Sequence, residues 1–149
     1  MTRRIDGLPY QLSITDTAGQ EEYRGLWATS NLKSDAFLLV YDITNENSLS
    51  ALDEYLEMLD VETEQRLEDN YHLMKQLGSH ARDYAVGTPP PVTMVVGNKC
   101  DLKEARAVPA RDGLEYARRN GCGFMETSAR EMVNIEETFA SMLVSILGR

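Results

Sequence analysis

Cysteine, positive charge and long apolar runs are all scarce in this sequence. Its two cysteines, Cys100 and Cys122, are too few for a disulfide framework and form no zinc-binding pattern, so we expect a reducing, cytoplasmic compartment. The formal net charge of -9 argues against a nucleic-acid partner, because clustered lysines and arginines bind phosphate backbones. No apolar run approaches membrane-spanning length, and the sequence closes on SILGR rather than on a cysteine-containing lipidation box, so we expect no membrane anchor in this chain.

Apolar runs and helical patterns alternate along the chain. Its 149 residues suit one domain, and 42% hydrophobic with 26% charged residues is typical of a globular protein. Three apolar runs that end in polar residues predict buried parallel strands in residues 35–44, 91–101 and 122–129. Apolar residues at helical spacing predict helices over 48–59, 109–119 and 134–147, after a hairpin in residues 2–16. This alternation predicts a mostly parallel α/β sheet, which binds ligands beyond the carboxyl ends of its strands.

The sequence NKCD, residues 98–101, directly follows one of these strands. Guanine presents its N1–H and its exocyclic amine as adjacent donors, and the carboxylate of Asp101 is suited to accept both in a fork. Adenine would leave the carboxylate facing an acceptor, so the group would select guanine as well as bind it. Asn98 would pair with the other edge of the base or tie neighbouring loops together, and the aliphatic stem of Lys99 would lie along the base plane.

The sequence TSA, residues 127–129, ends the next predicted strand in small residues. Backbone N–H groups in such a segment can approach a carbonyl oxygen such as guanine O6. Both sequences therefore predict guanine-binding groups at one edge of the sheet.

Three motifs, DTAGQ at residues 16–20, NKCD at 98–101 and ETSA at 126–129, occur here in an order that resembles the Ras-type small GTPases. The spellings DTAGQEEY and GNKCDL are most similar to the Ras subfamily, whereas VYDITN is equally typical of Rab proteins. The resemblance implies a fold like that of the P-loop NTPases, with a mostly parallel α/β sheet and flanking helices. It covers nearly the whole chain apart from one long insert.

The resemblance also implies roles for individual residues. Asp16 would hold Mg²⁺ through a water molecule, the Gly19 amide would contact the γ-phosphate, and Gln20 would orient the attacking water. Residues 19–32 would form a switch that responds to the bound nucleotide. The guanine pocket would be formed by Asn98, Lys99, Asp101, Ser128 and Ala129. The family further implies GTP and GDP with Mg²⁺ as ligands, effectors, an exchange factor and a GTPase-activating protein as partners, and action at the cytoplasmic face of membranes such as the plasma membrane.

A phosphate-binding loop is missing upstream of Asp16. Residues 1–15 contain no G-x-x-x-x-G-K-[ST] sequence, whose backbone N–H groups cradle phosphates. By the resemblance, 1–149 is a single partial domain that lacks the central first strand and the first helix of the sheet. That strand would lie between the strands ending at Asp16 and near Asp42, so their inner edges would be unpaired. We therefore expect GTP hydrolysis of a full-length parent and little or none of the isolated chain.

Residues 61–91 form an insert that is much longer than the usual connection in α/β proteins. The insert carries a helical stripe of Leu67, Tyr71, Met74 and Leu77, followed by Gly78, Gly87 and three prolines. Two interpretations are open: a docking element for a partner or membrane surface, or a solvated helical excursion packed on the preceding helix. Trp27, which stands where the family often has a charged residue, is similarly either a core anchor or an exposed binding aromatic.

Three hypotheses about function follow. The first is a Ras-like GTPase signalling switch of which this chain is an incomplete copy. The second is a nucleotide-independent binding module, a decoy for GTPase regulators. The third is a remnant that does not fold and aggregates through its strand edges. The intact Gln20, Asn98 and Asp101 favour the first, because a chain never used for nucleotide has no physical need of a guanine-selective carboxylate.

Overall fold

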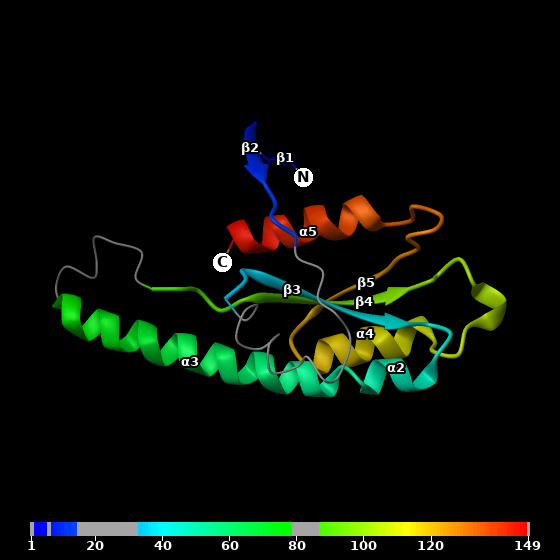
Figure 1. Ribbon diagram of the computed structural model, residues 1–149, viewed down its shortest axis with the longest axis horizontal. Coiled ribbons are helices and arrows are strands. Elements are labelled where there is room, and N and C mark those ends of the chain that lie inside the picture. The colour runs from blue at the N-terminus through cyan, green and yellow to red at the C-terminus, as the bar shows by residue number, and fades with distance from the viewer. Residues whose placement is uncertain (1, 6, 15–32, 79–86, 149) are drawn as a thin grey trace.

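A parallel sheet of three strands forms the centre of the computed structural model, which describes residues 2–5, 7–14, 33–78 and 87–148 (Figure 1). The strands are β3 (Ala36–Asp42), β4 (Val92–Asn98) and β5 (Gly123–Glu126), in the order β3-β4-β5. Both pairings are parallel. The predicted α/β fold is therefore confirmed, and each predicted strand lies within the residues that the apolar runs indicated.

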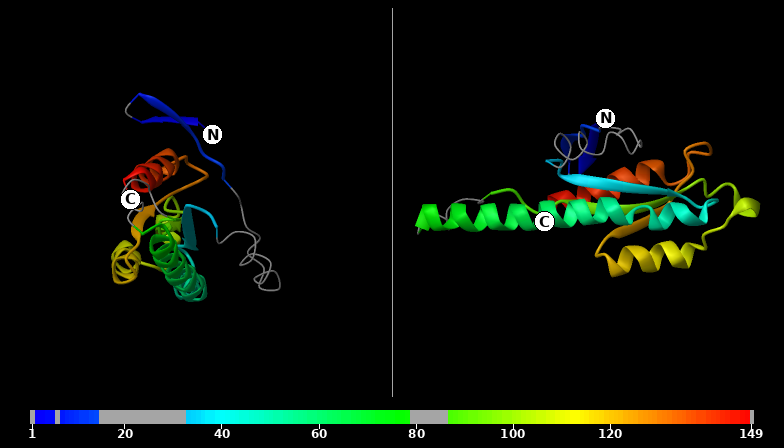
Figure 2. Two further views of the ribbon diagram at one scale, coloured as in Figure 1. Left: turned by 90° about the vertical axis from the view of Figure 1, so that its left-hand side faces the viewer. Right: turned by 60° about the horizontal axis from the view of Figure 1, so that its bottom comes forward.

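Helices cover both faces of this sheet. One face carries α2 (Glu46–Ser50), α3 (Asp53–Leu77) and α4 (Ala110–Arg119), and the other carries α5 (Ile135–Leu147) (Figures 1 and 2). A short 3-10 helix, η3 (Lys103–Ala105), precedes α4. The helices predicted over 109–119 and 134–147 are confirmed. Flanking helices on both faces explain why the strands are nearly continuous apolar runs.

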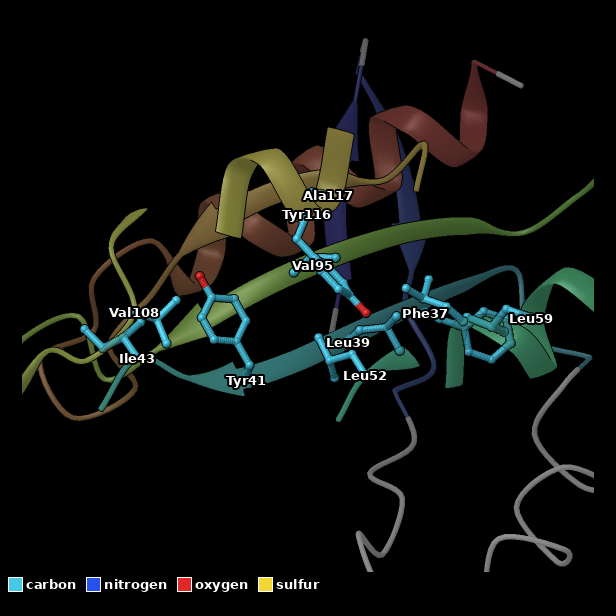
Figure 3. Close-up of a cluster of buried hydrophobic side chains, with 11 residues drawn as sticks. Phe37, Leu39, Tyr41, Ile43, Leu52, Leu59, Val95, Val108, Tyr116 and Ala117 are labelled. Carbon is cyan, nitrogen blue, oxygen red and sulfur yellow. The ribbon is translucent and has the colours of Figure 1, made fainter. Parts of the chain in front are cut away.

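The main core lies between the sheet and the layer of α3 and α4. Alternate residues of β3, namely Phe37, Leu39 and Tyr41, point into it, because side chains of a strand alternate between its two faces (Figure 3). The same cluster includes Ile43, Leu52, Leu56, Leu59, Val95, Val108, Tyr116 and Ala117. These contacts fix the end of β3 against the end of β4, where the predicted site lies.

Two glycines make room for the Tyr41 ring within this core. A Cβ atom at Gly97 would lie 2.7 Å from Tyr41 Oη, and one at Gly113 would clash with the same atom. Among the described residues the hydroxyl has no hydrogen-bond partner, and burial raises the pKa of Tyr41 to about 12. The absence of a side chain at both positions therefore allows a large ring to lie between β4 and α4.

The hairpin near the N-terminus consists of β1 (Thr2–Ile5) and β2 (Leu8–Gln11), paired antiparallel around a turn at Gly7, whose φ is +79°. The predicted hairpin is confirmed, but its second strand ends at Gln11 instead of continuing to residue 16. Ile14 is 52% exposed, so the period-two pattern that predicted the continuation has no core to face there. Trp27 and residues 15–32 lie outside the described residues.

Helix α3 has 25 residues and is far longer than the helix predicted over 48–59. The residues of that predicted helix belong partly to α2 and partly to the start of α3. The first part of the 61–91 segment continues α3. One of the two interpretations expected this part to pack on the preceding helix, and it does not. The predicted stripe is helical, but Leu67, Tyr71 and Met74 are all more than half exposed. Gly78, with a φ of +57°, ends the helix as predicted.

A buried arginine holds the returning segment against α3. Arg66 is 3% exposed and donates from Nε to Glu62 Oε1 at 2.9 Å. Its other nitrogens donate to the carbonyl oxygens of Pro89 at 3.0 Å and Ser34 at 2.9 Å. One guanidinium therefore joins α3 to the segments that lead into β3 and β4.

Candidate functional site

The carboxyl ends of β3, β4 and β5 meet at one edge of the sheet, and backbone hydrogen bonds lock their loops together. Ile43 N donates to Asn98 O at 3.2 Å, which joins the ends of β3 and β4. Thr127 N donates to Gly97 O at 2.8 Å, and Cys100 N donates to Thr127 O at 2.9 Å. The NKCD and TSA segments are therefore adjacent, as the strand pattern predicted.

Asp101 is oriented by Ser128, a residue with no exposed surface. Ser128 Oγ donates to Asp101 Oδ1 at 2.7 Å and accepts from the backbone N–H of Glu131 at 3.0 Å. The other oxygen, Asp101 Oδ2, has no hydrogen-bond partner among the described residues. One oxygen of this carboxylate is thus held in place, and the carboxylate can still accept further hydrogen bonds. Such a group is suited to accept hydrogen bonds from two adjacent donors.

The backbone of the TSA segment is more constrained than the sequence indicated. Ser128 N donates to Val133 O at 3.1 Å, and Val133 N returns a bond to Ser128 O at 2.9 Å. Since the N–H of Thr127 is bonded to Gly97, only Ala129 has a backbone N–H without a partner among the described residues of this segment. The predicted contact with a carbonyl oxygen is thus narrowed to Ala129, while Ser128 acts through its side chain.

Asn98 joins neighbouring loops, one of the two roles that the sequence left open. Its Oδ1 accepts a long hydrogen bond from Thr127 Oγ1 at 3.3 Å. Arg106 stabilises the same end of β5 by a bidentate pair with Glu126, at 2.7 and 2.8 Å. Arg106, which lies outside the three motifs, therefore contributes to the rigidity of this edge through Glu126.

Lys99 pairs with a residue that the sequence analysis did not assign. Its ammonium donates to Asp42 Oδ2 at 2.6 Å, and its backbone has a φ of +67°. The other oxygen, Asp42 Oδ1, accepts from the backbone N–H of Thr44 at 2.9 Å and from its hydroxyl at 2.7 Å. The polar end of the run VYDIT was the available signal, because a carboxylate at one strand end can reach a lysine at the next. Asp42 therefore fixes the direction in which Lys99 extends.

We expect NMR titration of the Asp42 carboxyl to give a pKa of about 2, and Lys99→Met to raise it toward the ordinary value of 3.8. The hydrogen bond from Lys99 is the largest cause of the lowered pKa. Because this pKa is depressed in the folded chain, its contribution to stability is present above pH 3.8 and is lost as the pH falls toward 2. Lys103→Met, at an exposed position, is the control and should leave the pKa of Asp42 unchanged. An equal pKa in wild type and Lys99→Met would contradict the pairing.

The other predicted site residues, Asp16, Gly19 and Gln20, lie outside the described residues, as does most of the predicted switch. Within the described part of the chain there is no cluster of three or more histidine, cysteine or acidic side chains able to hold a metal ion. None of the described helices is long and apolar enough to span a membrane. Of the predicted site residues, the structure therefore describes only those that the motifs predicted to bind the base.

Comparison with known proteins identifies a family and several relatives to which this sequence is similar. The sequence matches the Ras family over residues 1–79 and 56–148. It is 36% identical over 145 residues to the Ras-related protein RABA1b of Arabidopsis thaliana, covering 97% of this chain and 56% of that protein. It is 34% identical over 145 residues to the Ras-related protein Rab2BV of Beta vulgaris, covering 97% and 56% of the two chains. It is 33% identical over 147 residues to the Ras-related protein Rab11D of Nicotiana tabacum, covering 99% and 55%.

These relatives correct the predicted subfamily and show how much of a related protein this chain covers. Their names are Rab-type, so assignment to the Ras subfamily was too specific, and the spelling VYDITN was the better guide. The chain spans about half the length of the curated relatives it matches.

Proposed function

Because the chain belongs to the Ras family, we propose that it recognises a guanine nucleotide at the ends of β4 and β5, as part of a Rab-type switch. Proteins of this family bind GTP and GDP with Mg²⁺ and hydrolyse GTP. The parent switch would act in signalling or membrane trafficking at the cytoplasmic face of membranes, with effectors, an exchange factor and a GTPase-activating protein as partners. The Rab-type names of the relatives support this choice within the family.

The observation that carries the proposal is the hydrogen bond from Ser128 Oγ to Asp101 Oδ1 at 2.7 Å. With its carboxylate held in this way, Asp101 would accept the N1–H and the exocyclic amine of guanine, and the N–H of Ala129 would donate to guanine O6. Adenine presents neither this pair of donors nor this acceptor, so it would leave the carboxylate unpaired. Selectivity for guanine would therefore depend on groups whose positions are fixed before the base binds.

Lys99 and Asn98 would contribute to the same pocket. The ion pair with Asp42 directs the aliphatic stem of Lys99 along the edge of the sheet, where it would lie along the base plane. Asn98, bonded to Thr127, would keep the two loops at a fixed separation. The roles proposed for Asp16 with Mg²⁺, Gly19 with the γ-phosphate and Gln20 with the attacking water rest on the family resemblance alone.

A second candidate function, nucleotide-independent binding of a partner, is favoured by the exposed stripe on α3. Leu67, Tyr71 and Met74 are each more than half exposed on the half of α3 that extends beyond the sheet (Figure 2). We propose that residues 61–91 are an insertion in the family domain. The two matched segments, 1–79 and 56–148, overlap over residues 56–79, most of which belong to α3, and this overlap supports a break in the family pattern there.

Titration of the purified chain with GDP and GTP in the presence of Mg²⁺ tests the proposed function. We expect GDP and GTP to bind weakly and ATP not to displace them. We expect GTP hydrolysis to proceed near the background rate. Asp101→Ala should weaken GDP binding at least about 30-fold, because loss of a hydrogen-bonded charged partner costs about 2 kcal/mol or more. Asp112→Ala, which removes an exposed carboxylate on α4, should leave the affinity unchanged.

The other possible results of the titration would count against the proposed role of Asp101 or in favour of the second candidate function. Binding that ATP displaces, or that survives Asp101→Ala, would contradict the role of the carboxylate. A folded chain that binds no guanine nucleotide would favour the second candidate function.

A further inference from the structure

One side of α3 carries a continuous row of exposed residues at coiled-coil spacing. Alternating steps of four and three residues keep side chains on one side of a helix, and such a row ordinarily packs against a second helix. We call the seven residues of α3 that are spaced in this way the outer row: Asp53, Glu57, Asp60, Glu64, Leu67, Tyr71 and Met74. All seven are exposed. The outer row is therefore suited to contact another helix that lies along α3.

Helix α4 already lies beside the start of the outer row. The hydroxyl of Tyr116 on α4 donates to the carboxylate of Asp53. Burial raises the pKa of the Cys122 thiol, and the nearby carboxylate of Asp60 raises it further, so Asp60 lies near the loop that follows α4. Helix α4 ends at Arg119, whereas α3 continues well past that end (Figures 1 and 2). A helix that packed on the rest of the outer row would therefore continue the line of α4 along α3.

The segment that returns from α3 toward β4 is bonded to a different side of the helix. Thr88 N donates to Asn70 Oδ1, and Asn70 Nδ2 donates to Thr88 O, both at 2.8 Å. Arg66 donates to Pro89 O at 3.0 Å. On a helix with 3.6 residues per turn, Arg66 and Asn70 lie roughly a quarter of a turn from the outer row. The described part of the returning segment therefore leaves the outer row exposed.

The part of the outer row beyond Asp53 begins with three acidic residues, Glu57, Asp60 and Glu64, which we call its acidic half. None of the three forms an ion pair within the part of the chain that the structure describes. The nearby Arg66 is buried and pairs with Glu62, so it does not neutralise them. Carboxylates in one line without counter-charges attract lysine and arginine side chains and repel anionic surfaces.

The outer row ends with three apolar residues, Leu67, Tyr71 and Met74, which we call its apolar half. They are 53%, 56% and 53% exposed. Single exposed apolar residues are common on protein surfaces, but several in one row indicate a contact surface. Tyrosine and methionine are also enriched in interfaces between proteins. The apolar half is therefore suited to accept the apolar face of a helix.

The charge of the outer row argues against a second copy of this chain or a membrane surface as its occupant. In a parallel pair of copies one acidic half would meet the other, and each copy carries a net charge of -9. In an antiparallel pair each acidic half would face an apolar half, so its carboxylates would lose water without gaining a partner. A membrane rich in anionic lipids would be repelled by the same carboxylates. A helix that bears both basic and apolar residues matches both halves.

We propose that the outer row from Glu57 to Met74 binds a basic amphipathic helix of a partner protein. The partner helix lies along α3 beyond the end of α4, with lysines or arginines on the acidic half and apolar side chains on the apolar half. Residues 57–74 span about 27 Å, so a helix of about 18 residues covers them. The inference rests on the second candidate function, partner binding through α3, and specifies the chemistry of the partner.

Fluorescence anisotropy with a labelled synthetic peptide tests the proposal on the full chain. The probe is a helical peptide of about 18 residues with a single row at the same spacing, three lysines in one half of the row and three leucines in the other, and alanine and glutamine elsewhere. We expect saturable binding that added salt weakens, because salt screens the attraction between lysines and carboxylates. A scrambled peptide of the same composition should bind at least about tenfold more weakly, because its lysines and leucines no longer share one row.

Substitutions in the apolar half test the apolar contact without unfolding the chain, because the residues are exposed. The double variant Leu67→Ala with Met74→Ala should weaken peptide binding at least about tenfold, as expected when the centre of an interface is truncated. The matched control is Val144→Ala with Leu147→Ala on α5, where the two side chains are 56% and 44% exposed. This control should bind the peptide as the wild type does.

Substitutions in the acidic half test the charge contact. Asp60→Asn with Glu64→Gln should weaken peptide binding about fivefold and reduce its dependence on salt. The matched control, Asp112→Asn with Glu115→Gln, removes the same number of charges from exposed positions on α4 and should leave binding unchanged. An equal loss in these two variants would show that only the net charge of the chain attracts the peptide, and it would overturn the proposal.

Other results would also overturn the proposal. These are a folded chain that shows no saturable peptide binding, a dimer in light scattering that Leu67→Ala with Met74→Ala disrupts, and binding to vesicles of anionic lipid that the same variant abolishes. Titration of the same samples with GDP keeps the guanine site separate from this inference. GDP binding without peptide binding would overturn the inference alone, whereas peptide binding without GDP binding would support it and contradict guanine recognition.

Discussion

Replacement of Arg66 by methionine should lower the free energy of unfolding by about 3–5 kcal/mol, as expected when one partner of a buried ion pair is removed. The side chains of Arg66 and Glu62 are 4% and 9% exposed. The variant leaves the Glu62 carboxylate buried without its counter-charge, and it leaves the carbonyl oxygens of Pro89 and Ser34 without their donor. Urea unfolding followed by circular dichroism measures the loss.

Two further variants test whether the loss of stability comes from leaving a buried charge unpaired. Arg111→Met removes an arginine that is 88% exposed and 3.8 Å from Asp112, and it should change stability by no more than about 0.5 kcal/mol. The double variant Glu62→Leu with Arg66→Met should recover much of the loss, because no buried charge remains unpaired. A loss below about 1 kcal/mol for Arg66→Met alone would show that the guanidinium does not hold the segments together.

Replacement of Ile43 by alanine should cost about 3 kcal/mol of unfolding free energy. Ile43 is fully buried and packs in the cluster that includes Tyr41 and Val108 (Figure 3). Truncation of a buried isoleucine loses both apolar burial and the contacts that surround the resulting cavity. Differential scanning calorimetry or urea unfolding gives the value.

The backbone hydrogen bonds of Ile43 allow the effect of this substitution to be measured locally. Its carbonyl accepts from Ala107 N at 2.7 Å and from Val108 N at 2.9 Å. These two amides should exchange faster with solvent in Ile43→Ala, while amides in α5 should not change beyond the global loss of stability. The control is Val144→Ala at an exposed position, where a change above about 0.5 kcal/mol would show that truncation at any position is destabilising.

The sheet was predictable from the sequence because its strands are contiguous apolar runs with polar ends. A run such as residues 35–44 is long enough for a buried strand and too short for a typical helix. Adjacency of Asp101 and Ser128 followed from the same pattern, since parallel strands bring their carboxyl ends together. The pairing of Ser128 N with Val133 did not follow, because local sequence does not show which backbone groups a loop bonds to itself.

The length of α3 was not predictable for a different reason. After Leu59 its buried residues are Glu62 and Arg66, and the helix then exposes the apolar stripe that ordinarily marks a helix packed on a core. Asp42 was missed because an acidic residue at a strand end has many possible partners, and only the fold places Lys99 within 2.6 Å of it.

The length of α3 also determines how the molecule rotates in solution. A helix of 25 residues is about 37 Å long, close to the diameter of about 38 Å expected for a compact protein of 149 residues. Much of α3 extends beyond the sheet (Figure 1), so rotation of the helix axis is slower than rotation about it. Backbone N–H bonds in a helix lie along its axis, and those of α3 therefore reorient with the slowest component of tumbling. Nitrogen relaxation in α3 should accordingly differ from that in helices inclined to it, even where both are equally rigid.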